Sequence, residues 1–345
     1  MWPYVAEPAD GPADLIARTL QSARGEGRQV KVSVREPPGD APGLAPPEPR
    51  VLLDRAEPLE ALTGRPVRAA DSSGFTHFLD GIQVTRQVAF FDHLPVVFAH
   101  VAAAIRERRE RRLSTWGEPR RRDLVLAPVT VAPEGAVGVR APGDTPEEVH
   151  PLRWRELIRR EVDRLRETLE RDLAARWIVE HDRARETGAL LVDGGITDRE
   201  AVSRRLHDHG ALVGVVKSHH TQYFAGAAQE AVWSLREGER SFAFQLRGPA
   251  GVEVLSWYLR LREPVAAPTF GLVRVEAARS LGLGAVDRIS AWLLRERSPL
   301  SLPDGRWDKM VYPVRDVELY LRSLAPSAGV LTGALLRADR GARRD

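Results

Sequence analysis

Three short apolar runs each end on one charged residue. Phe75–Asp80 and Ala189–Asp193 both end on an aspartate that a glycine follows, and Ala211–Lys217 ends on a lysine. Apolar runs of this length are typical of buried strands, and Asp-Gly pairs indicate turns. Two carboxylates and a cation brought to one sheet edge could hold a divalent metal ion against a phosphate. The sequence therefore predicts a metal-assisted phosphate site.

Oxygen ligands from Asp80 and Asp193 suit a hard cation such as Mg²⁺ or Mn²⁺, and a pair of such ions could activate water at a phosphodiester. Asp-Gly is also a common turn dipeptide, so each pair alone favours a simple turn. Two pairs, each ending a buried-type strand, favour the site. Lys217 could neutralise a phosphate or extend into solvent, and at most one of the vicinal His219 and His220 could face the site.

Composition limits the protein class. The 345 residues are 43% hydrophobic, enough for a substantial core, and the formal net charge is only +3. There is no cysteine, which excludes disulfides, thiolate zinc sites and a cysteine nucleophile. We find neither a stretch of membrane-span length nor a signal-peptide pattern, so we expect a cytoplasmic protein that does not bind a membrane.

Two regions differ in pattern. Residues 1–70 form an N-terminal arm with an amphipathic helix at Ala13–Ala23 and a Pro-rich linker at Glu36–Pro49. Residues 71–345 alternate strand and helix patterns and are expected to form one domain.

The second region begins with strands and continues with alternating helices and strands. A long helix at Pro151–Glu186 has one apolar face and one face rich in Arg and Glu. Shorter helices are expected near Asp198–His207 and Ala225–Leu235, before a helical C-terminal region. The expected strands are Phe75–Asp80, Gln83–Phe91, Val96–Ala102, Asp123–Val131, Ala189–Asp193, Ala211–Val216, Ser241–Leu246, Val252–Leu261 and Leu272–Glu276.

This order predicts an α/β fold, a mixed sheet flanked by helices. Three antiparallel strands followed by helix-connected parallel strands is also the order of an RNase H-like sheet. Between these two groups of strands, the basic run Arg106–Arg122 could follow a nucleic-acid backbone, with Trp116 stacking on a base. The competing interpretation of this run is a solvated helix face. The acidic residues of the long helix are expected mostly to pair with nearby arginines.

Read in order, several short motifs resemble the NurA family of prokaryotic DNA-end nucleases. They span about Gly74 to Tyr320 and gain specificity from their order and spacing. The motifs are FLDG around Asp80, LLVDGG around Asp193, VGVVKS around Lys217, WYLRL at Trp257–Leu261, VRVE ending on Glu276, and VYPV at Val311–Val314.

The resemblance implies an RNase H-like, Piwi-related fold over residues 71–345. It implies a Mn²⁺-dependent deoxyribonuclease, with Mg²⁺ possible, that cuts single-stranded DNA and resects 5′ ends. It also implies a homodimer docked on a HerA-type hexameric helicase/translocase, in DNA repair or anti-phage defence. A toroidal partner would have to supply translocation, because the chain has no GxxxxGK[ST] phosphate loop of its own.

The family's site residues map onto this sequence by motif. Asp80 and Asp193 would be the metal-binding aspartates and Lys217 the strand-end lysine. Glu170, with Glu180 as the next choice, would be the helix glutamate that completes the metal site. Tyr312 would be the family's late tyrosine.

The chain departs from the family at two places. Ile82 follows the first Asp-Gly, where the family usually has serine. Tyr320 stands where the family commonly places a histidine or acidic residue that faces the metal, with Asp316 and Glu318 nearby.

There are two alternatives to a metal-dependent nuclease. One is a catalytically weak or silent scaffold that grips DNA for the same motor. The other is a phosphatase or phosphotransferase acting on a small phosphate ester, which would need a small closed pocket rather than a long basic groove.

Overall fold

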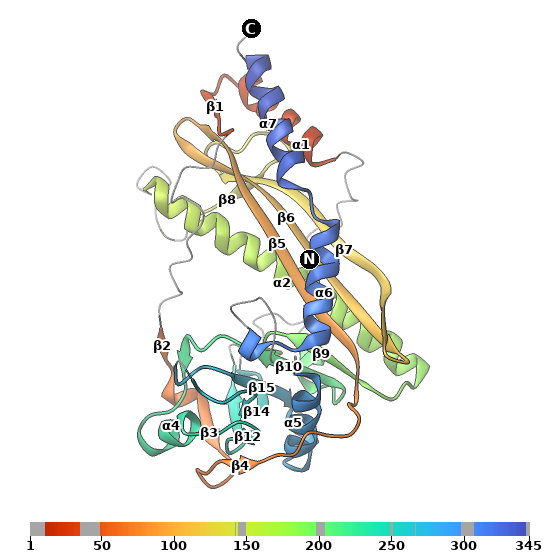
Figure 1. Cartoon of the computed structure of the whole chain (residues 1–345). Coiled ribbons are helices and arrows are strands. Elements are labelled where there is room, and N and C mark those ends of the chain that lie inside the picture. The colour runs from red at the N-terminus through yellow and green to blue at the C-terminus, as the bar shows by residue number, and fades with distance from the viewer. Residues whose placement is uncertain are drawn as a thin grey trace.

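One large mixed sheet runs through the molecule (Figure 1). The computed structural model describes residues 11–34, 49–141, 143, 150–197, 204–248, 251–265, 267–297 and 307–342. The main strand order is β3-β13-β14-β15-β10-β9-β5-β6-β7-β8, with β1 paired to β5, and β12 paired to β14 and β4. The strands are β1 (Val30–Val32), β3 (Ala56–Pro58), β4 (Arg65–Pro66), β5 (Phe75–Phe91), β6 (Leu94–Arg109), β7 (Arg112–Pro128), β8 (Val137–Val139), β9 (Ala189–Asp193), β10 (Leu212–Val216), β12 (Glu239–Arg240), β13 (Phe244–Arg247), β14 (Glu253–Arg260) and β15 (Leu272–Ala278), while β2 (Arg50–Val51) and β11 (Thr221–Gln222) form a separate pair.

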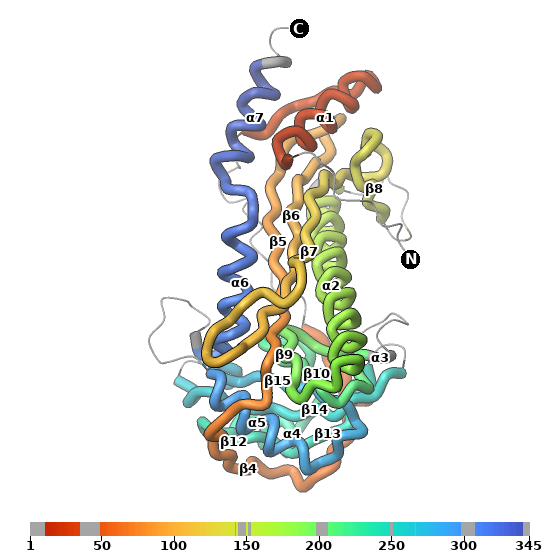
Figure 2. The backbone as a smooth tube through the Cα atoms, turned by 90° about the vertical axis from the view of Figure 1, so that its right-hand side faces the viewer, coloured from red at the N-terminus to blue at the C-terminus, as the bar shows by residue number. Residues whose placement is uncertain are grey.

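Helices cover both faces of the sheet. Figure 2 shows α2 on one side of β5, β6 and β7, and α6 with α7 on the other. The helices are α1 (Pro12–Gly25), α2 (Pro151–Ala184), α3 (Arg204–Asp208), α4 (Gly226–Trp233), α5 (Gly284–Glu296), α6 (Tyr312–Leu324) and α7 (Ala328–Ala342). The predicted α/β class, a mixed sheet flanked by helices, is confirmed.

The long helix forms because apolar side chains recur every three, four or seven residues. Its buried stripe includes Trp154, Val162, Leu169 and Trp177, which pack on the β5–β6 face of the sheet. On the solvent side, arginines pair with acidic residues three or four positions away, as in Arg176–Glu180 and Arg164–Glu161. Both the helix and the pairing of its acidic residues were predicted correctly.

The first Asp-Gly pair is not a turn, which corrects one prediction. Phe75–Asp80 and Gln83–Phe91 belong to the single strand β5, and Asp80 lies in its interior, paired with Ala104 of β6. The strand continues because β6 supplies an antiparallel partner on one side, with one register shift between Gln87 and Ala89, after β9 has ended on the other. Between the expected strands Gln83–Phe91 and Val96–Ala102, the chain turns at Asp92-His93, with both residues at positive φ.

The basic segment is not helical, which corrects a second interpretation. It forms the ends of β6 and β7, joined by a tight turn at Glu110-Arg111 with φ of 49° and 72°. At the start of β7 the partly buried Leu113 and Thr115 alternate with the exposed Arg112 and Ser114, which suits a half-buried ribbon rather than a helix.

The parallel strands and the helices after them agree with the sequence pattern. β9 has the predicted bounds, β10 differs by one residue, and the strands predicted after Ser241 correspond to β13, β14 and β15. The start of the helix expected near Asp198–His207 and most of the predicted linker Glu36–Pro49 lie outside the described residues.

The described part of residues 11–70 joins both ends of the fold. α1 packs against α7 through Ile16 and Leu20, and β3 and β4 pair with β13 and β12. The domain boundary at residue 70 stays a prediction.

Tyr312–Arg340 passes a length and composition test for a membrane span. It comprises α6 and α7, and α6 packs on the sheet through Val314, Val317 and Leu321. This stretch departs from the expectation that no stretch reaches membrane-span length, and 22% of its apolar window is buried. The cytoplasmic location stays a prediction.

Candidate functional site

Strand register brings the two aspartates to one level of the sheet. β9 lies parallel to β5 with Leu79 opposite Val192, so Asp80 and Asp193 are the next residue on each strand. β10 lies parallel on the other side of β9, with Val215 opposite Asp193. Two residues later, the Lys217 ammonium lies 2.9 Å from a carboxylate oxygen of Asp193. The three predicted charged residues therefore converge at the carboxyl ends of β9 and β10.

The second Asp-Gly pair does form a turn, and this turn fixes Asp193. Gly194 has φ of 129°, which favours glycine, and its N–H donates to the carbonyl of Val215 over 2.9 Å. A Cβ at Gly214 would lie only 2.6 Å from the Gly194 carbonyl oxygen. The glycines let the turn fold back onto β10.

A buried glutamate from β15 anchors the same turn. One carboxylate oxygen of Glu276 accepts the backbone N–H of Ile196 over 2.6 Å and that of Thr197 over 3.2 Å. The other oxygen pairs with Arg274, whose guanidinium lies over the ring of Tyr223. This role of Glu276 was not predicted from the sequence. Its only signal is the alternation of Arg274 and Glu276 within an otherwise apolar strand.

Helix α2 delivers the third carboxylate. Glu170 is buried against Gly81, where a Cβ would lie 2.2 Å from the Glu170 Oε1 atom. The glycine after Asp80 thus makes room for an acidic side chain rather than for a turn. Arg166, one turn earlier on α2, forms an ion pair with Glu170. The i,i+4 spacing of Arg166 and Glu170 is the signal that could have found this arginine.

Burial and like charge raise the pKa values of two acids. Asp80 is 7% exposed, and its burial, with the negative charges of Asp193 and Glu170, raises its pKa well above the usual range despite Lys217. Burial raises the pKa of Glu170 to about 7, with the charge of Asp193 acting in the same direction and Arg166 opposing it.

Asp80 is held by the backbone only. Its carboxylate accepts the N–H of Gly81 over 2.8 Å, and within the described ranges no side chain donates a hydrogen bond to it. The three carboxylates repel one another and offer only oxygen atoms as metal ligands. Such a set suits a hard divalent cation.

The late residues lie elsewhere. Tyr312 begins α6 with 58% of its surface exposed, and within the part of the chain described here no hydrogen bond joins it to Asp80, Asp193 or Glu170. Further along α6, the ring of Tyr320 lies 4.9 Å from the Arg106 guanidinium, which also pairs with Asp316 over 2.9 Å. Arg106 of β6 therefore contacts both Tyr320 and Asp316, two of the residues at or near the expected late ligand position.

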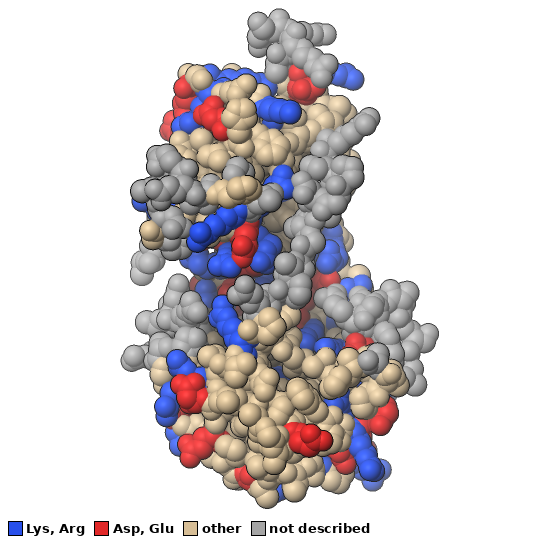
Figure 3. Space-filling view, turned by 90° about the vertical axis from the view of Figure 1, so that its left-hand side faces the viewer, with Lys and Arg blue, Asp and Glu red and all other residues tan. Residues whose placement is uncertain are grey.

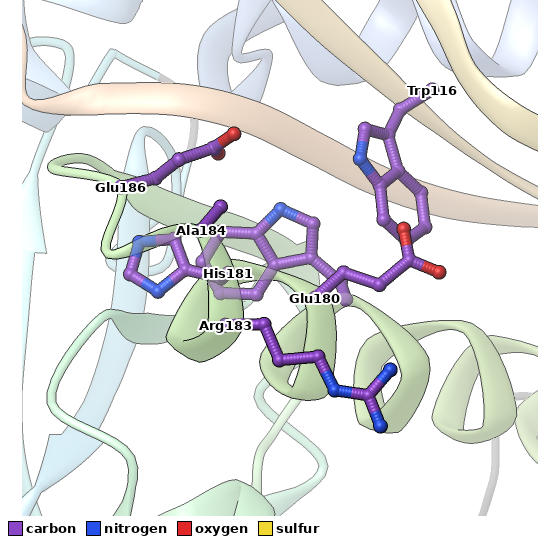
Figure 4. Close-up of a pocket in the computed structure, with 7 residues that line it drawn as sticks. Trp116, Glu180, His181, Arg183, Ala184 and Glu186 are labelled. Atoms are coloured by element: carbon purple, nitrogen blue, oxygen red, sulfur yellow. The ribbon is translucent and has the colours of Figure 1, made fainter.

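The alternative helix glutamate is not near Asp80. Glu180 pairs with Arg176 and lines a cavity of about 400 Å³ at the C-terminal end of α2, next to Trp116 and His181 (Figure 4). His219 also has a partner away from the aspartates. Its Nε2–H donates to the Leu272 carbonyl over 2.8 Å, and burial lowers its pKa to about 4.

A second group with ligand chemistry lies beside this cavity. His181, Asp182 and His209 have ligand atoms within 4.8 Å of one another and could hold a metal ion. The sequence gives no signal for this group, because His209 is distant in sequence and joins the others only in the fold.

Comparison with known proteins adds no identification. No protein-family model matches the chain, and the comparison with curated proteins gave no match.

Proposed function

We propose that this chain is a metal-dependent deoxyribonuclease with an RNase H-like sheet. The observation that carries the proposal is the convergence of Asp80, Asp193 and Glu170 beside Lys217. The strand order β7-β6-β5-β9-β10, antiparallel through β5 and parallel in β9 and β10, supports the RNase H-like assignment.

The carboxylates would hold Mn²⁺ or Mg²⁺, which when bound activates water and neutralises charge on a phosphodiester. Asp80 and Asp193 supply the ligand oxygens, and Glu170 approaches from α2. The Lys217 ammonium has three N–H donors and pairs with Asp193 in this structure. When Asp193 ligates the metal ion, this ammonium would be released to stabilise the phosphate oxygens. Arg166 keeps Glu170 oriented toward Gly81.

DNA as substrate is part of the same proposal, with a HerA-type hexamer as partner and a homodimer as the assembly. The motif order in the sequence supports these elements. Figure 3 adds that basic side chains gather at the narrowing between the two ends of the molecule, while the lower end is mostly uncharged on this face. Such a distribution favours a polyanion over a small neutral ligand.

The decisive test is cleavage of a single-stranded oligonucleotide with Mn²⁺. We expect Asp80→Asn and Asp193→Asn to lower the rate at least 100-fold, because each removes an anionic ligand, and Glu170→Gln to lower it at least 10-fold. Glu180→Gln is the matched control, since it removes a glutamate of the same helix outside the site. Cleavage that persists in the aspartate variants would refute the assignment of the site.

A DNA-gripping scaffold with weak or absent activity is the second candidate. The contacts of Arg106 with Asp316 and Tyr320 favour it, because Tyr320 offers a phenol in place of a histidine or acidic ligand and Asp316 would have to leave Arg106 to bind a metal ion. The scaffold predicts DNA binding without cleavage, both for the chain alone and with its motor. A small-ester phosphatase is favoured by neither described cavity, since the site acids line neither one.

A further inference from the structure

The C-terminal turn of α2 meets the loop before β10 at two imidazoles and one carboxylate. The His209 Nε2 atom lies 3.0 Å from an oxygen of Asp182, and the His181 Nδ1 atom lies 3.9 Å from the same oxygen. A tetrahedral ion with bonds of 2.0–2.1 Å needs ligand atoms about 3.4 Å apart. The two distances lie on either side of this value, so small side-chain movements would close the site.

The tautomer of His181 leaves a lone pair that no group uses. Its Nε2 atom lies 3.2 Å from the carbonyl of Gly188, which can only accept, so Nε2 carries the proton. The Nδ1 atom is then an acceptor, and it is buried without a hydrogen-bond partner. A ring N–H donated to a backbone carbonyl is the usual support for a metal-ligating histidine.

We propose that His181 Nδ1, Asp182 and His209 Nε2 bind one zinc-class transition-metal ion, separate from the three strand-level carboxylates. Two imidazoles and a carboxylate favour Zn²⁺ over Mg²⁺ or Ca²⁺, which prefer all-oxygen sites. Water fills the fourth position, because Asp182 is 62% exposed. The ion replaces the Nε2 proton that His209 shares with Asp182. This proton moves to Nδ1, which gives up a weak 3.4 Å bond from the Ala211 N–H.

The site is distinct because Glu170 lies eleven residues before His181 on α2, about 16 Å along the helix axis. A bound ion would tie the end of α2 to the loop that leads into β10. Helix α2 carries Glu170, and Lys217 follows β10 at the end opposite this loop. The ion would therefore fix the position of α2 relative to β10, the two elements that hold these residues of the proposed active site.

Zinc titration calorimetry on a tag-free, metal-stripped full chain tests this proposal. The chain carries Asp193→Asn to weaken the strand-level site, so the result does not depend on nuclease activity. We expect one Zn²⁺ per chain and a zinc-dependent rise in Tm. Adding Asp182→Asn or His209→Gln should lower the affinity at least about 100-fold, since loss of a supporting group alone costs 10–100-fold.

Asp208→Asn is the matched control, because Asp208 is a neighbouring carboxylate that is 74% exposed and outside the group. It should keep full affinity and the rise in Tm. Asp182 is exposed, so its variant should fold like the parent even if His209→Gln does not. Zinc affinity in Asp182→Asn equal to that of the parent, or no zinc binding by the parent, would overturn the proposal.

Discussion

Gly81 is important for the site because it has no side chain. It lies in extended β5 with no positive φ, so its value is the space that it leaves for the Glu170 carboxylate. A methyl group there would push Glu170 away from Asp80. The contact between Gly81 and Glu170 thus joins strand β5 to helix α2.

At this scale we expect Gly81→Ala to destabilise the chain by about 1–3 kcal/mol through overpacking and to impair any cleavage. In a Glu170→Ala background the same change should cost much less, because the clashing carboxylate is gone. Urea unfolding of the parent, the two single variants and the double variant gives the coupling energy between residues 81 and 170. Equal costs in both backgrounds would show that Glu170 is not what excludes a side chain at residue 81.

The acidic pair also predicts a pH dependence. Glu170 has an ordinary pKa of 4.5 when unfolded and of about 7 in the folded chain, so the folded state binds more protons between these values. The free energy of unfolding should therefore fall as the pH rises from about 4.5 to about 7 in metal-free buffer, and Asp80 acts in the same direction. Urea unfolding of Glu170→Gln across this window should give a shallower fall. A slope unchanged in this variant would assign the effect to other groups.

At the scale of elements, the turn after β9 depends on β15. Glu276 satisfies two N–H groups of the turn and the buried charge of Arg274 at once. Asp193 is fixed at the end of β9 because the next residues are held in this way.

We expect Glu276→Gln to cost about 3 kcal/mol, because it leaves the Arg274 charge buried without its partner. Cleavage should fall as well, through a displaced Asp193. Glu253→Gln is the control: it removes a partly buried partner of two exposed arginines, Arg247 and Arg279, and should cost no more than about 1 kcal/mol in the same urea experiment. A small loss in Glu276→Gln would mean that the glycines alone hold the turn.

The elements were largely readable from the sequence, and the completed site was not. Apolar runs and one amphipathic face gave β9, β10 and α2, and charged residues at their ends gave Asp193 and Lys217. The continuation of β5 past Asp80 depends on pairing with β6, which no local signal near Asp-Gly encodes. Glu276 and His209 reach their partners only through tertiary contacts between segments far apart in sequence.

At the scale of the whole molecule, the described residues form three apolar cores around the sheet. One lies under α2, one under α5 and α6, and one between α1, α7 and the far ends of β5 and β6. The carboxylates lie between the first two, where burial makes their repulsion a cost to global stability.

We therefore expect Asp80→Asn to raise the free energy of unfolding by about 1–2 kcal/mol in EDTA, because it removes a buried like charge. In an Asp182→Asn background, which weakens the proposed zinc-class site, Mn²⁺ should raise the Tm of the chain but not that of the chain that also carries Asp80→Asn, since binding to the folded state alone stabilises it. Differential scanning calorimetry with and without Mn²⁺ measures both effects. A metal response preserved in Asp80→Asn would place the ion elsewhere.

The unbroken run of β5 has a mechanical consequence. Asp80 is flanked on both sides by rungs of the antiparallel ladder with β6, from His77 opposite Glu107 to Phe91 opposite Leu94. Ladder hydrogen bonds lie across the strands, so tension applied along β5 loads many of them in shear at the same time. A carboxylate mounted in the middle of such a ribbon keeps its position under a pull that would peel a strand end away.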